Sequence, residues 1–314
     1  MKTSIRNYIG IARCDHWVKN IFVFPGVISA SPLLGIPFSA FIPELFFGFL
    51  SVCLISSSNY VINEWLDAGY DKFHPLKKNR PSVVGALKRK FVYLEYLLLM
   101  TAGLGLALAV SKSFFIMSVF FLFMGILYNV KPIRTKDIPV VDVLSESINN
   151  PVRLILGWFI VSSELLPPAS LLLSYWMGGA FFMSLKRFGE YRYISSTETA
   201  AAYRKSFRCY NEQRLLIIAF FFAMACALNL GVFLVKYKTD LILTFPFVAL
   251  LFAWYFYLAL KENSSVQYPE RLYKERGFMI YCALFTIQFV VFMMCDVHFL
   301  DWLLNDEFLI NPLQ

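Results

Sequence analysis

The sequence predicts an all-α integral membrane protein, folded as a bundle of about nine transmembrane helices. Of its 314 residues, 58% are hydrophobic and only 16% are charged, and the mean hydropathy is +0.60. This composition is too apolar for a soluble domain. The apolar residues also recur in runs of about 20, the length that a helix needs to cross the hydrocarbon core. No linker separates the runs, so we expect one domain over residues 1–314.

Nine such runs follow one another along the chain. The fourth run is the shortest, and the fifth differs from the others because it contains Asp142, Glu146 and Arg153. An odd number of crossings places the two termini on opposite sides of the membrane. The runs lie at residues 17–35, 43–65, 91–110, 113–130, 139–163, 169–187, 214–236, 241–260 and 277–300.

Positive charge indicates how the bundle is oriented. Of the 29 Lys and Arg residues, 25 lie in the N-terminal tail and in the second, fourth, sixth and eighth loops, or within three residues of them at the ends of the runs. The opposite loops hold Lys112, Lys236 and Lys238. Because Lys and Arg near span ends concentrate on the cytoplasmic side, we expect a cytoplasmic N-terminus in an inner, cytoplasmic membrane. The net charge of +8 follows the span ends and forms no separate basic domain, so we expect no nucleic-acid partner.

The most informative segment follows the second apolar run. Asn63, Asp67 and Asp71 are spaced i, i+4 and i+8, so a helix stacks them on one face. Mg²⁺ takes oxygen ligands and is usually held by one or two carboxylates together with substrate phosphates. Lys77 and Arg80, just beyond, supply donors for phosphate oxygens. The segment therefore predicts a site for a magnesium-bound diphosphate on the cytoplasmic side of the membrane.

A plainer interpretation is that Asp67 and Asp71 are solvated acids at a helix end, and that the basic cluster only sets the topology. Two carboxylates at the C-terminal end of a helix oppose the helix macrodipole, however. A divalent cation would compensate them, and this favours the metal site.

The stretch from Asn63 to Asp71 resembles a family motif, Asn-Asp-x-x-Asp-x-x-x-Asp, with Glu64 in place of the first Asp. The motif is that of the UbiA superfamily of intramembrane prenyltransferases, and the resemblance extends over most of the chain. It implies nine transmembrane helices and a diphosphate bound through Mg²⁺, here held by Asn63, Asp67 and Asp71. Typical members alkylate aromatic acceptors with prenyl diphosphates and carry a second Asp-rich motif in the sixth loop, which this chain lacks.

The sixth loop is basic where typical members are acidic. Its Lys-Arg-aromatic-small-Glu stretch resembles the branch that contains decaprenyl-phosphate phosphoribosyltransferase, and residues 17–20 and 128–153 agree with that branch. A phosphoribosyl transfer joins two anions, phosphoribosyl pyrophosphate and a polyprenyl phosphate, which suits extra cations. The resemblance implies catalytic and metal-binding roles for Asn63, Asp67 and Asp71. It implies substrate binding by Lys19, Lys77, Arg80, Tyr128, Lys131, Asp142, Arg153, Lys186, Arg187, Glu190 and Arg192.

Several of these residues have a structural alternative. Ionisable residues at membrane depth are usually functional or paired, so Arg153 either binds an anionic headgroup or serves the fold. Lys19 either anchors a lipid phosphate or extends to the interface. Lys186 and Glu190 are spaced i, i+4 and are able to pair with each other.

Three functions remain open at this point. The first is a Mg²⁺-dependent transferase that moves 5-phosphoribose from phosphoribosyl pyrophosphate to a polyprenyl phosphate in the membrane, with release of pyrophosphate. Such a product would serve a cell-envelope polysaccharide pathway, by the resemblance. The second is a prenyltransferase that uses a prenyl diphosphate and an aromatic acceptor. The third is a non-enzymatic carrier of lipid phosphates, although no repeats or broken helices in matching halves indicate a transporter.

Overall fold

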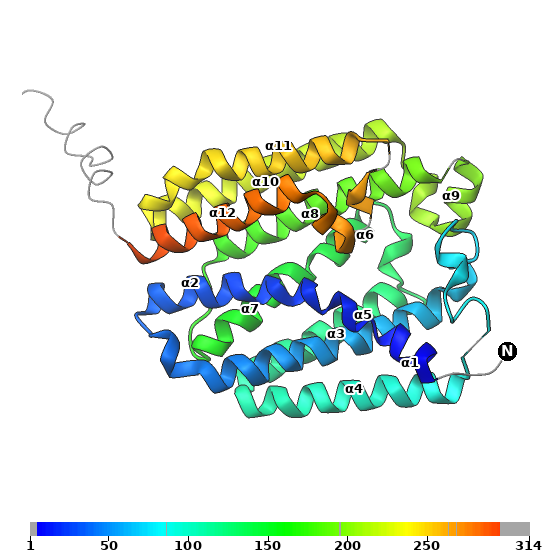
Figure 1. Ribbon diagram of the computed structural model, residues 1–314, viewed down its shortest axis with the longest axis horizontal. Coiled ribbons are helices and arrows are strands. Elements are labelled where there is room, and N and C mark those ends of the chain that lie inside the picture. The colour runs from blue at the N-terminus through cyan, green and yellow to red at the C-terminus, as the bar shows by residue number, and fades with distance from the viewer. Residues whose placement is uncertain (1–4, 86, 195, 263, 268, 296–314) are drawn as a thin grey trace, which may run out of the picture.

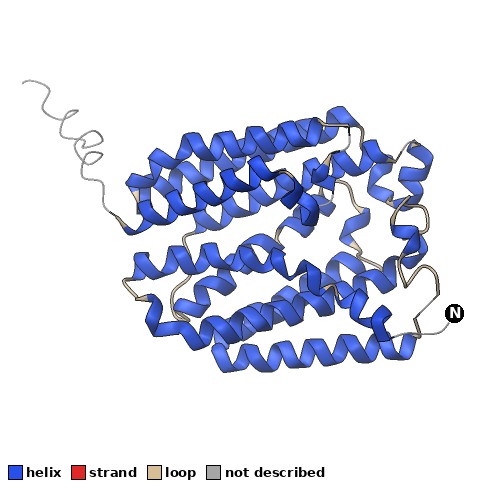
Figure 2. Cartoon of the chain, viewed as in Figure 1, coloured by secondary structure: helices blue, strands red, loops and turns tan. Residues whose placement is uncertain are grey.

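Helices are the regular elements of this protein, and the residues that the structure describes contain no strand (Figures 1 and 2). The structure is a computed structural model that describes residues 5–295, except residues 86, 195, 263 and 268. The α-helices are α1 (Ile5–Ala12), α2 (Phe24–Leu34), α3 (Ile42–Asp71), α4 (Arg89–Val110), α5 (Lys112–Asn129), α6 (Val141–Ser147), α7 (Asn149–Val161), α8 (Ala169–Tyr193), α9 (Thr197–Tyr203), α10 (Glu212–Tyr237), α11 (Phe245–Leu260) and α12 (Arg276–Met294). The 3₁₀ segments are η1 (Cys14–Val23), η2 (Phe38–Phe41), η3 (Lys77–Asn79), η4 (Thr135–Asp137), η5 (Lys205–Arg208), η6 (Thr239–Thr244), η7 (Ser265–Gln267) and η8 (Pro269–Lys274).

Within the described ranges, seven segments are long and apolar enough to cross a membrane. They match the first four and the last three predicted runs, and they confirm the predicted class, an all-α integral membrane protein. Residues 296–300 of the ninth predicted run lie outside the described residues. The second segment extends beyond its predicted end at residue 65, because α3 continues as a helix to Asp71. The segments are Ile5–Leu34, Phe38–Asp71, Arg89–Val110, Lys112–Asn129, Glu212–Tyr237, Thr239–Leu260 and Arg276–Met294.

The fifth and sixth predicted runs are more polar. The fifth forms two helices, α6 and α7, which are separated at Ile148. Its ionisable residues Asp142 and Arg153 are buried in protein, where they meet polar partners that lipid does not offer. The sixth run is α8, which continues past the predicted end at residue 187 to Tyr193. Neither run is among the seven segments, so a bundle of nine crossings stays a prediction.

Two large apolar cores hold the bundle together. In one, α8 packs against α10 and α11 around Phe181, Phe222 and Tyr255. In the other, α2, α3, α5 and α7 meet around Val52 and Phe121. Figure 1 shows α10, α11 and α12 along one side of the bundle and α3 and α4 along the other. Of the helices between them, α7 has 9 of its 13 residues buried and α8 has 12 of its 25, and this burial explains why they tolerate more polar residues.

Glycines let α2 and α7 approach each other closely. A Cβ atom added to Gly26 would lie 2.0 Å from the backbone oxygen of Leu154, and one added to Gly157 would lie 1.9 Å from the backbone oxygen of Val23. Small residues allow this close backbone contact between membrane helices. The contact fixes α2 beside α7 and so positions η1, which leads into α2.

The polar loops gather at one end of the bundle. In Figure 1, α1, α9 and the segment after α3 lie at this end, opposite the turn between α2 and α3. The helices α3 and α8 end here, while α10 and α12 begin here. Charged residues far apart in the sequence therefore meet at this end.

Candidate functional site

The last two turns of α3 present the predicted acidic motif. The helix runs unbroken to Asp71, so Asn63, Asp67 and Asp71 have the spacing that the sequence predicted. The three side chains have different partners. The Asn63 amide donates to Asn129 Oδ1 at 2.6 Å, Asp67 accepts from Lys136 at 2.5 Å, and Asp71 accepts from Arg80 at 2.5 Å. Each carboxylate of the motif is thus held by at least one cation.

The fourth loop brings two cations onto Asp67. Arg134 Nη2 lies 2.9 Å from Asp67 Oδ1, and its guanidinium lies over the Tyr70 ring. Lys136 Nζ also donates to Asn129 Oδ1 at 2.6 Å, so it joins Asp67 to the Asn63–Asn129 pair. Both side chains are buried, and burial lowers the pKa of Lys136 to about 8, while Asp67 acts in the opposite direction. The fourth loop is therefore part of the site.

The end of α8 carries a second group of ion pairs. Arg187, with a side chain only 1% exposed, lies 3.3 Å from Asp142 and 2.7 Å from Glu190, and it also bonds Glu146. Tyr128 donates to Glu146 at 2.6 Å. An isolated charge is costly to bury, so the Arg187 guanidinium depends on these carboxylates. The three carboxylates share further cations in Lys186, Lys77 and Arg204.

Lys77 and Arg204 connect the two groups. Lys77 Nζ lies 3.2 Å from Glu190 and also bonds Tyr203. Burial opposes the charge of Lys77, but Glu190 and Tyr203 raise its pKa above the ordinary lysine value. Arg204 lies 3.6 Å from Asp142. A narrow cavity of about 20 Å³ lies between the groups, lined by Asp67, Tyr70, Asp71, Arg134, Lys136, Asp137, Tyr203 and Arg204.

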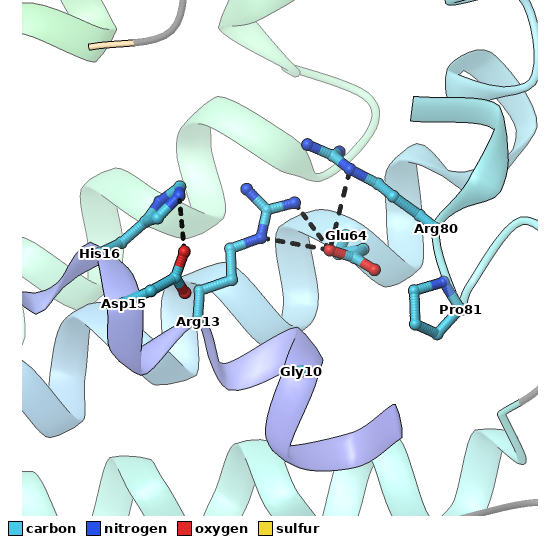
Figure 3. A pocket seen from close by; sticks show the side chains of 7 residues that line it. All are labelled: Gly10, Arg13, Asp15, His16, Glu64, Arg80 and Pro81. Carbon is cyan, nitrogen blue, oxygen red and sulfur yellow. Dashed lines mark hydrogen bonds and ion pairs between the residues drawn. The ribbon is translucent and has the colours of Figure 1, made fainter. Parts of the chain in front are cut away.

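Glu64 faces a different cavity. Figure 3 shows Arg13 and Arg80 pointing toward its carboxylate from different segments of the chain. Arg13 Nη2 lies 2.7 Å from Glu64 Oε2, and Arg80 Nε lies 4.0 Å from the same oxygen. This cavity has a volume of about 260 Å³. Glu64, the residue that departs from the family motif, is thus paired with arginines and does not line the cavity of Asp67 and Asp71.

The donor set suits a hard divalent cation that is shared with a substrate. Asp67, Asp71 and Asp137 bring carboxylate oxygens to the narrow cavity. Among the described residues, no group of three or more His, Cys, Asp or Glu side chains is placed to hold a metal ion. Mg²⁺ commonly binds through one or two carboxylates plus phosphate oxygens, so the chain offers what such an ion needs only when a phosphorylated substrate supplies further ligands.

Four predicted site residues lie outside this network. Lys131 is exposed on the loop after α5, and Arg192 is exposed and donates to the Leu260 carbonyl at 3.0 Å. Arg153 Nε donates to Asn20 Oδ1 at 3.0 Å. Lys19 lies near His16 on η1, with its Nζ 3.1 Å from His16 Nδ1. The structure therefore does not bring these four residues to Asp67 and Asp71.

The expected pair between Lys186 and Glu190 is replaced by other contacts. Lys186 lies 3.2 Å from Glu146 on α6, whereas Glu190 binds Lys77 and Arg187. Tertiary neighbours of opposite charge outcompete the i, i+4 partner here because α6 packs directly against α8.

Several residues of the site were missing from the sequence-based set. Glu146 had a signal, since it is an acid inside an apolar run, where ionisable residues are usually paired or functional. Arg13, Arg134, Lys136 and Arg204 are basic residues that also fit a topology signal, so the sequence could not separate them from ordinary surface charges. The remaining three are neutral, and no pattern in the sequence marks them. The full set of missing residues is Arg13, Asn129, Arg134, Lys136, Glu146, Tyr203, Arg204 and Tyr210.

The fold and the charged site define a helical membrane protein with a network of buried ion pairs at one end of its bundle. Residues 21–294 match the UbiA prenyltransferase family, and the chain belongs to this family. Solved structures agree on the fold. A UbiA homolog from Archaeoglobus fulgidus bound to GPP and Mg²⁺ superposes with a TM-score of 0.71 at 19% identity, covering 92% of this chain and 99% of that one. A digeranylgeranylglyceryl phosphate synthase superposes with a TM-score of 0.63 at 14% identity, covering 92% and 98%.

Relatives in sequence are distant. The nodulation protein NoeC of Azorhizobium caulinodans is 26% identical over 192 residues, 60% of this chain and 59% of that protein. An uncharacterized protein of Sinorhizobium fredii is 25% identical over 49% of this chain and 28% of that protein. The chain therefore spans less than two thirds of the length of these two relatives. Decaprenyl-phosphate phosphoribosyltransferase of Mycolicibacterium smegmatis is 24% identical over 218 residues, 69% of this chain and 66% of that protein.

Proposed function

We propose that the protein transfers 5-phosphoribose from phosphoribosyl pyrophosphate to a polyprenyl phosphate in the membrane, with release of pyrophosphate. One observation carries the proposal. The sixth loop contributes a cation, Arg204, to the cavity that Asp67 and Asp71 line, whereas the typical prenyltransferases that the sequence resembles have a second acidic motif in this loop. A cavity that gathers Arg134, Lys136 and Arg204 around the acidic motif suits two phosphorylated substrates better than it suits one prenyl diphosphate.

The distant relatives support the same choice. Three relatives with the name decaprenyl-phosphate phosphoribosyltransferase are 24% or 25% identical over 66% to 70% of this chain. Identity at this level does not identify a substrate by itself. It agrees, however, with the basic sixth loop, which is an independent feature of the residues.

The chemistry that the site has to perform is a displacement at ribose C1. The bond from C1 to the pyrophosphate oxygen breaks, and a phosphate oxygen of the lipid forms the new bond to C1. A phosphate monoester is already an anion at neutral pH, so the nucleophile needs no general base. Lys77 and Arg204 would stabilise the negative charge that builds on the departing pyrophosphate.

Mg²⁺, when bound, would neutralise the charge of the pyrophosphate and so favour its departure. Asp67 and Asp71 would hold the ion. Asn63 would help to orient these carboxylates through its hydrogen bond to Asn129. Arg134, Lys136 and Arg80 now occupy these carboxylates, so binding of the ion requires that at least one of these cations shifts toward the substrate phosphates.

The test uses purified full-length protein in detergent with Mg²⁺, a polyprenyl phosphate, and phosphoribosyl pyrophosphate labelled in its 5-phosphate. We expect label in the organic phase. Asp67→Asn and Arg204→Gln should each reduce this transfer by about 100-fold or more, which corresponds to about 2.7 kcal/mol of transition-state stabilisation. Arg192→Gln is the matched control, because Arg192 is a basic residue outside the network, and it should leave the rate within about twofold.

A different product would contradict the proposal. If the folded protein forms no labelled lipid but joins a prenyl diphosphate to an aromatic acid, it is a conventional prenyltransferase. If it binds polyprenyl phosphate without turnover of either donor, it is a carrier.

A further inference from the structure

Arg80 connects the larger cavity to the narrow one, because it lines the larger cavity and pairs with Asp71, which lines the narrow one. The walls of the larger cavity come from α1, the start of η1, the end of α3 and the segment after η3 (Figure 3). Arg80 reaches both sides, since its Nη1 atom lies 2.5 Å from Asp71 and its Nε atom lies 4.0 Å from Glu64. A ligand in the larger cavity would therefore contact the same guanidinium that holds the acidic motif.

The chemistry of this cavity combines cations with a buried acid. Arg13 donates to Glu64 Oε2 through both Nε, at 3.2 Å, and Nη2, at 2.7 Å. Ser82 Oγ lies 3.4 Å from Glu64 Oε1. The Glu64 side chain is 4% exposed and the Arg13 side chain 16%. His16 and Asp15 complete the polar lining, with 3.7 Å between His16 Nε2 and Asp15 Oδ2.

We infer that this cavity binds the ribose 5-phosphate half of the donor, with phosphate oxygens on Arg13 and Arg80 and ribose hydroxyls on Glu64. This inference rests on the proposed function and names the subsite that its sugar would occupy. The phosphate takes the place that the Glu64 carboxylate now holds on Arg13, because the Nε and Nη2 donors of the guanidinium can bind a phosphate oxygen as they bind Glu64 Oε2. The released carboxylate then accepts hydrogen bonds from the sugar hydroxyls. A phosphate or a prenyl chain alone does not offer such hydroxyl donors.

The size and lining of the cavity favour this ligand over a lipid. Its volume of about 260 Å³ is just below the range of about 300–1,000 Å³ that is typical of pockets for drug-sized ligands, so one sugar phosphate fits and a polyprenyl chain does not. The lining side chains are charged or polar apart from Pro81, whereas an isoprenoid requires apolar walls.

The extra methylene of Glu64 gains a function in this arrangement. The family motif has Asp at this position. The longer side chain of Glu64 reaches Arg13, a residue 51 positions earlier in the turn between α1 and η1. Glu64 is then a specificity-determining residue for the sugar, separate from the carboxylates that would hold the metal.

Binding experiments with the full-length protein in detergent test this subsite without turnover. Ribose 5-phosphate, measured by titration calorimetry, should bind the wild type and should bind Glu64→Gln about tenfold more weakly, because a hydrogen bond to a carboxylate is stronger than one to an amide. The wild type should also prefer ribose 5-phosphate over 2-deoxyribose 5-phosphate, and Glu64→Gln should lose this preference. Glu44→Gln, the same change at the opposite end of α3, should behave as the wild type does.

A second variant closes the cavity without a change of charge. An added Cβ at Gly10 meets no atom within 4 Å, so Gly10→Leu should fold and should fill the space at this wall. It should lose ribose 5-phosphate binding and keep binding of magnesium pyrophosphate, while Asp67→Asn should do the reverse. Retained pyrophosphate binding also shows that a variant is folded.

The outcomes separate this inference from the proposed function. In one outcome, the protein transfers phosphoribose to lipid while its binding of ribose 5-phosphate does not change in Glu64→Gln and Gly10→Leu. That result would overturn the subsite alone. Binding that responds to both variants without any transfer to lipid would support the subsite and overturn the proposed reaction. A short isoprenyl monophosphate that displaces ribose 5-phosphate, and that binds the wild type and Glu64→Gln with equal affinity, would show a general phosphate site. This result would contradict the sugar assignment.

Discussion

At the residue scale, the charged end of the bundle depends on buried ions that neutralise each other. Arg187 is the clearest case, since its guanidinium meets Asp142, Glu146 and Glu190 with almost no contact with solvent. The sequence assigned Arg187 to substrate binding. In the structure its donors are already used, so its first effect is on the stability of the site.

Replacing Arg187 should therefore destabilise the protein strongly. Arg187→Met leaves three carboxylates without their central cation, and we expect a loss of about 3–5 kcal/mol in the free energy of unfolding. Arg192→Met, on the same helix but exposed, should change it by about 0.5 kcal/mol or less. Thermal and denaturant unfolding in detergent measure both, and equal stability of the two variants would contradict the assigned role.

His74 gives the folded protein a defined response to acid. Its ring is buried, and Nδ1 accepts from the backbone N–H groups of Leu76 and Lys77. Burial, and then the nearby Lys77, lowers the pKa of His74 from 6.5 to about 4. Between these values the unfolded chain holds more protons than the folded protein, so stability falls as the pH decreases from about 6.5 toward about 4.

His74→Asn should remove this dependence, because the amide oxygen of Asn can accept the same backbone donors. The wild type should lose up to about 3 kcal/mol more than the variant over this pH window, from a shift of about 2.5 pKa units. Unfolding measured at several pH values gives the two slopes. Parallel slopes would show that His74 is already charged in the folded state.

At the element scale, the crossing of α2 and α7 carries a sharp prediction. Gly157→Ala would place a methyl group 1.9 Å from the Val23 backbone oxygen, and a backbone atom cannot move aside without shifting the helix. We expect a destabilisation of about 1–3 kcal/mol. Gly231→Ala on α10 is the control, because its added Cβ meets nothing within 4 Å, and it should be neutral or slightly stabilising. Unfolding in detergent compares them.

The fourth loop, which begins where α5 ends, brings two cations to the site. It packs Arg134 and Lys136 onto α3, and Arg134 adopts a left-handed conformation with a φ of 35°. Such a backbone conformation is uncommon for residues other than glycine and is often found at functional sites. The basic residues of this loop fitted the topology signal in the sequence, whereas the path of the backbone turns them inward.

At the scale of the whole molecule, the orientation in the membrane remains a prediction from loop charge. Alkaline phosphatase joined after Ser163, in the loop between α7 and α8, should be active because that enzyme works only outside the cytoplasm. The same enzyme joined after Lys205, in the sixth loop, should be inactive, and a fluorescent protein there should be bright. The reverse pattern would invert the topology, and equal activity at both points would show that α8 does not cross.

The sequence predicted the class of the fold and the nucleus of the site. Composition and the apolar runs gave the membrane-spanning helices because a bilayer imposes a length and a hydropathy on each of them. The i, i+4, i+8 spacing of Asn63, Asp67 and Asp71 applies in the structure because α3 continues as a helix to Asp71. Local rules of this kind act along one segment, so one sequence suffices to apply them.

Only the tertiary structure decided which charges meet. It placed Glu64 on Arg13 and not beside Asp67, gave Lys186 to Glu146, and left Arg192 at the surface. These outcomes depend on contacts between segments that are distant in sequence, and any buried ion pairs with whichever opposite charge the packing brings within reach. The sequence by itself thus determined the helices and the acidic motif, while the arrangement of the helices in space determined the two cavities and the partners of every buried charge around them.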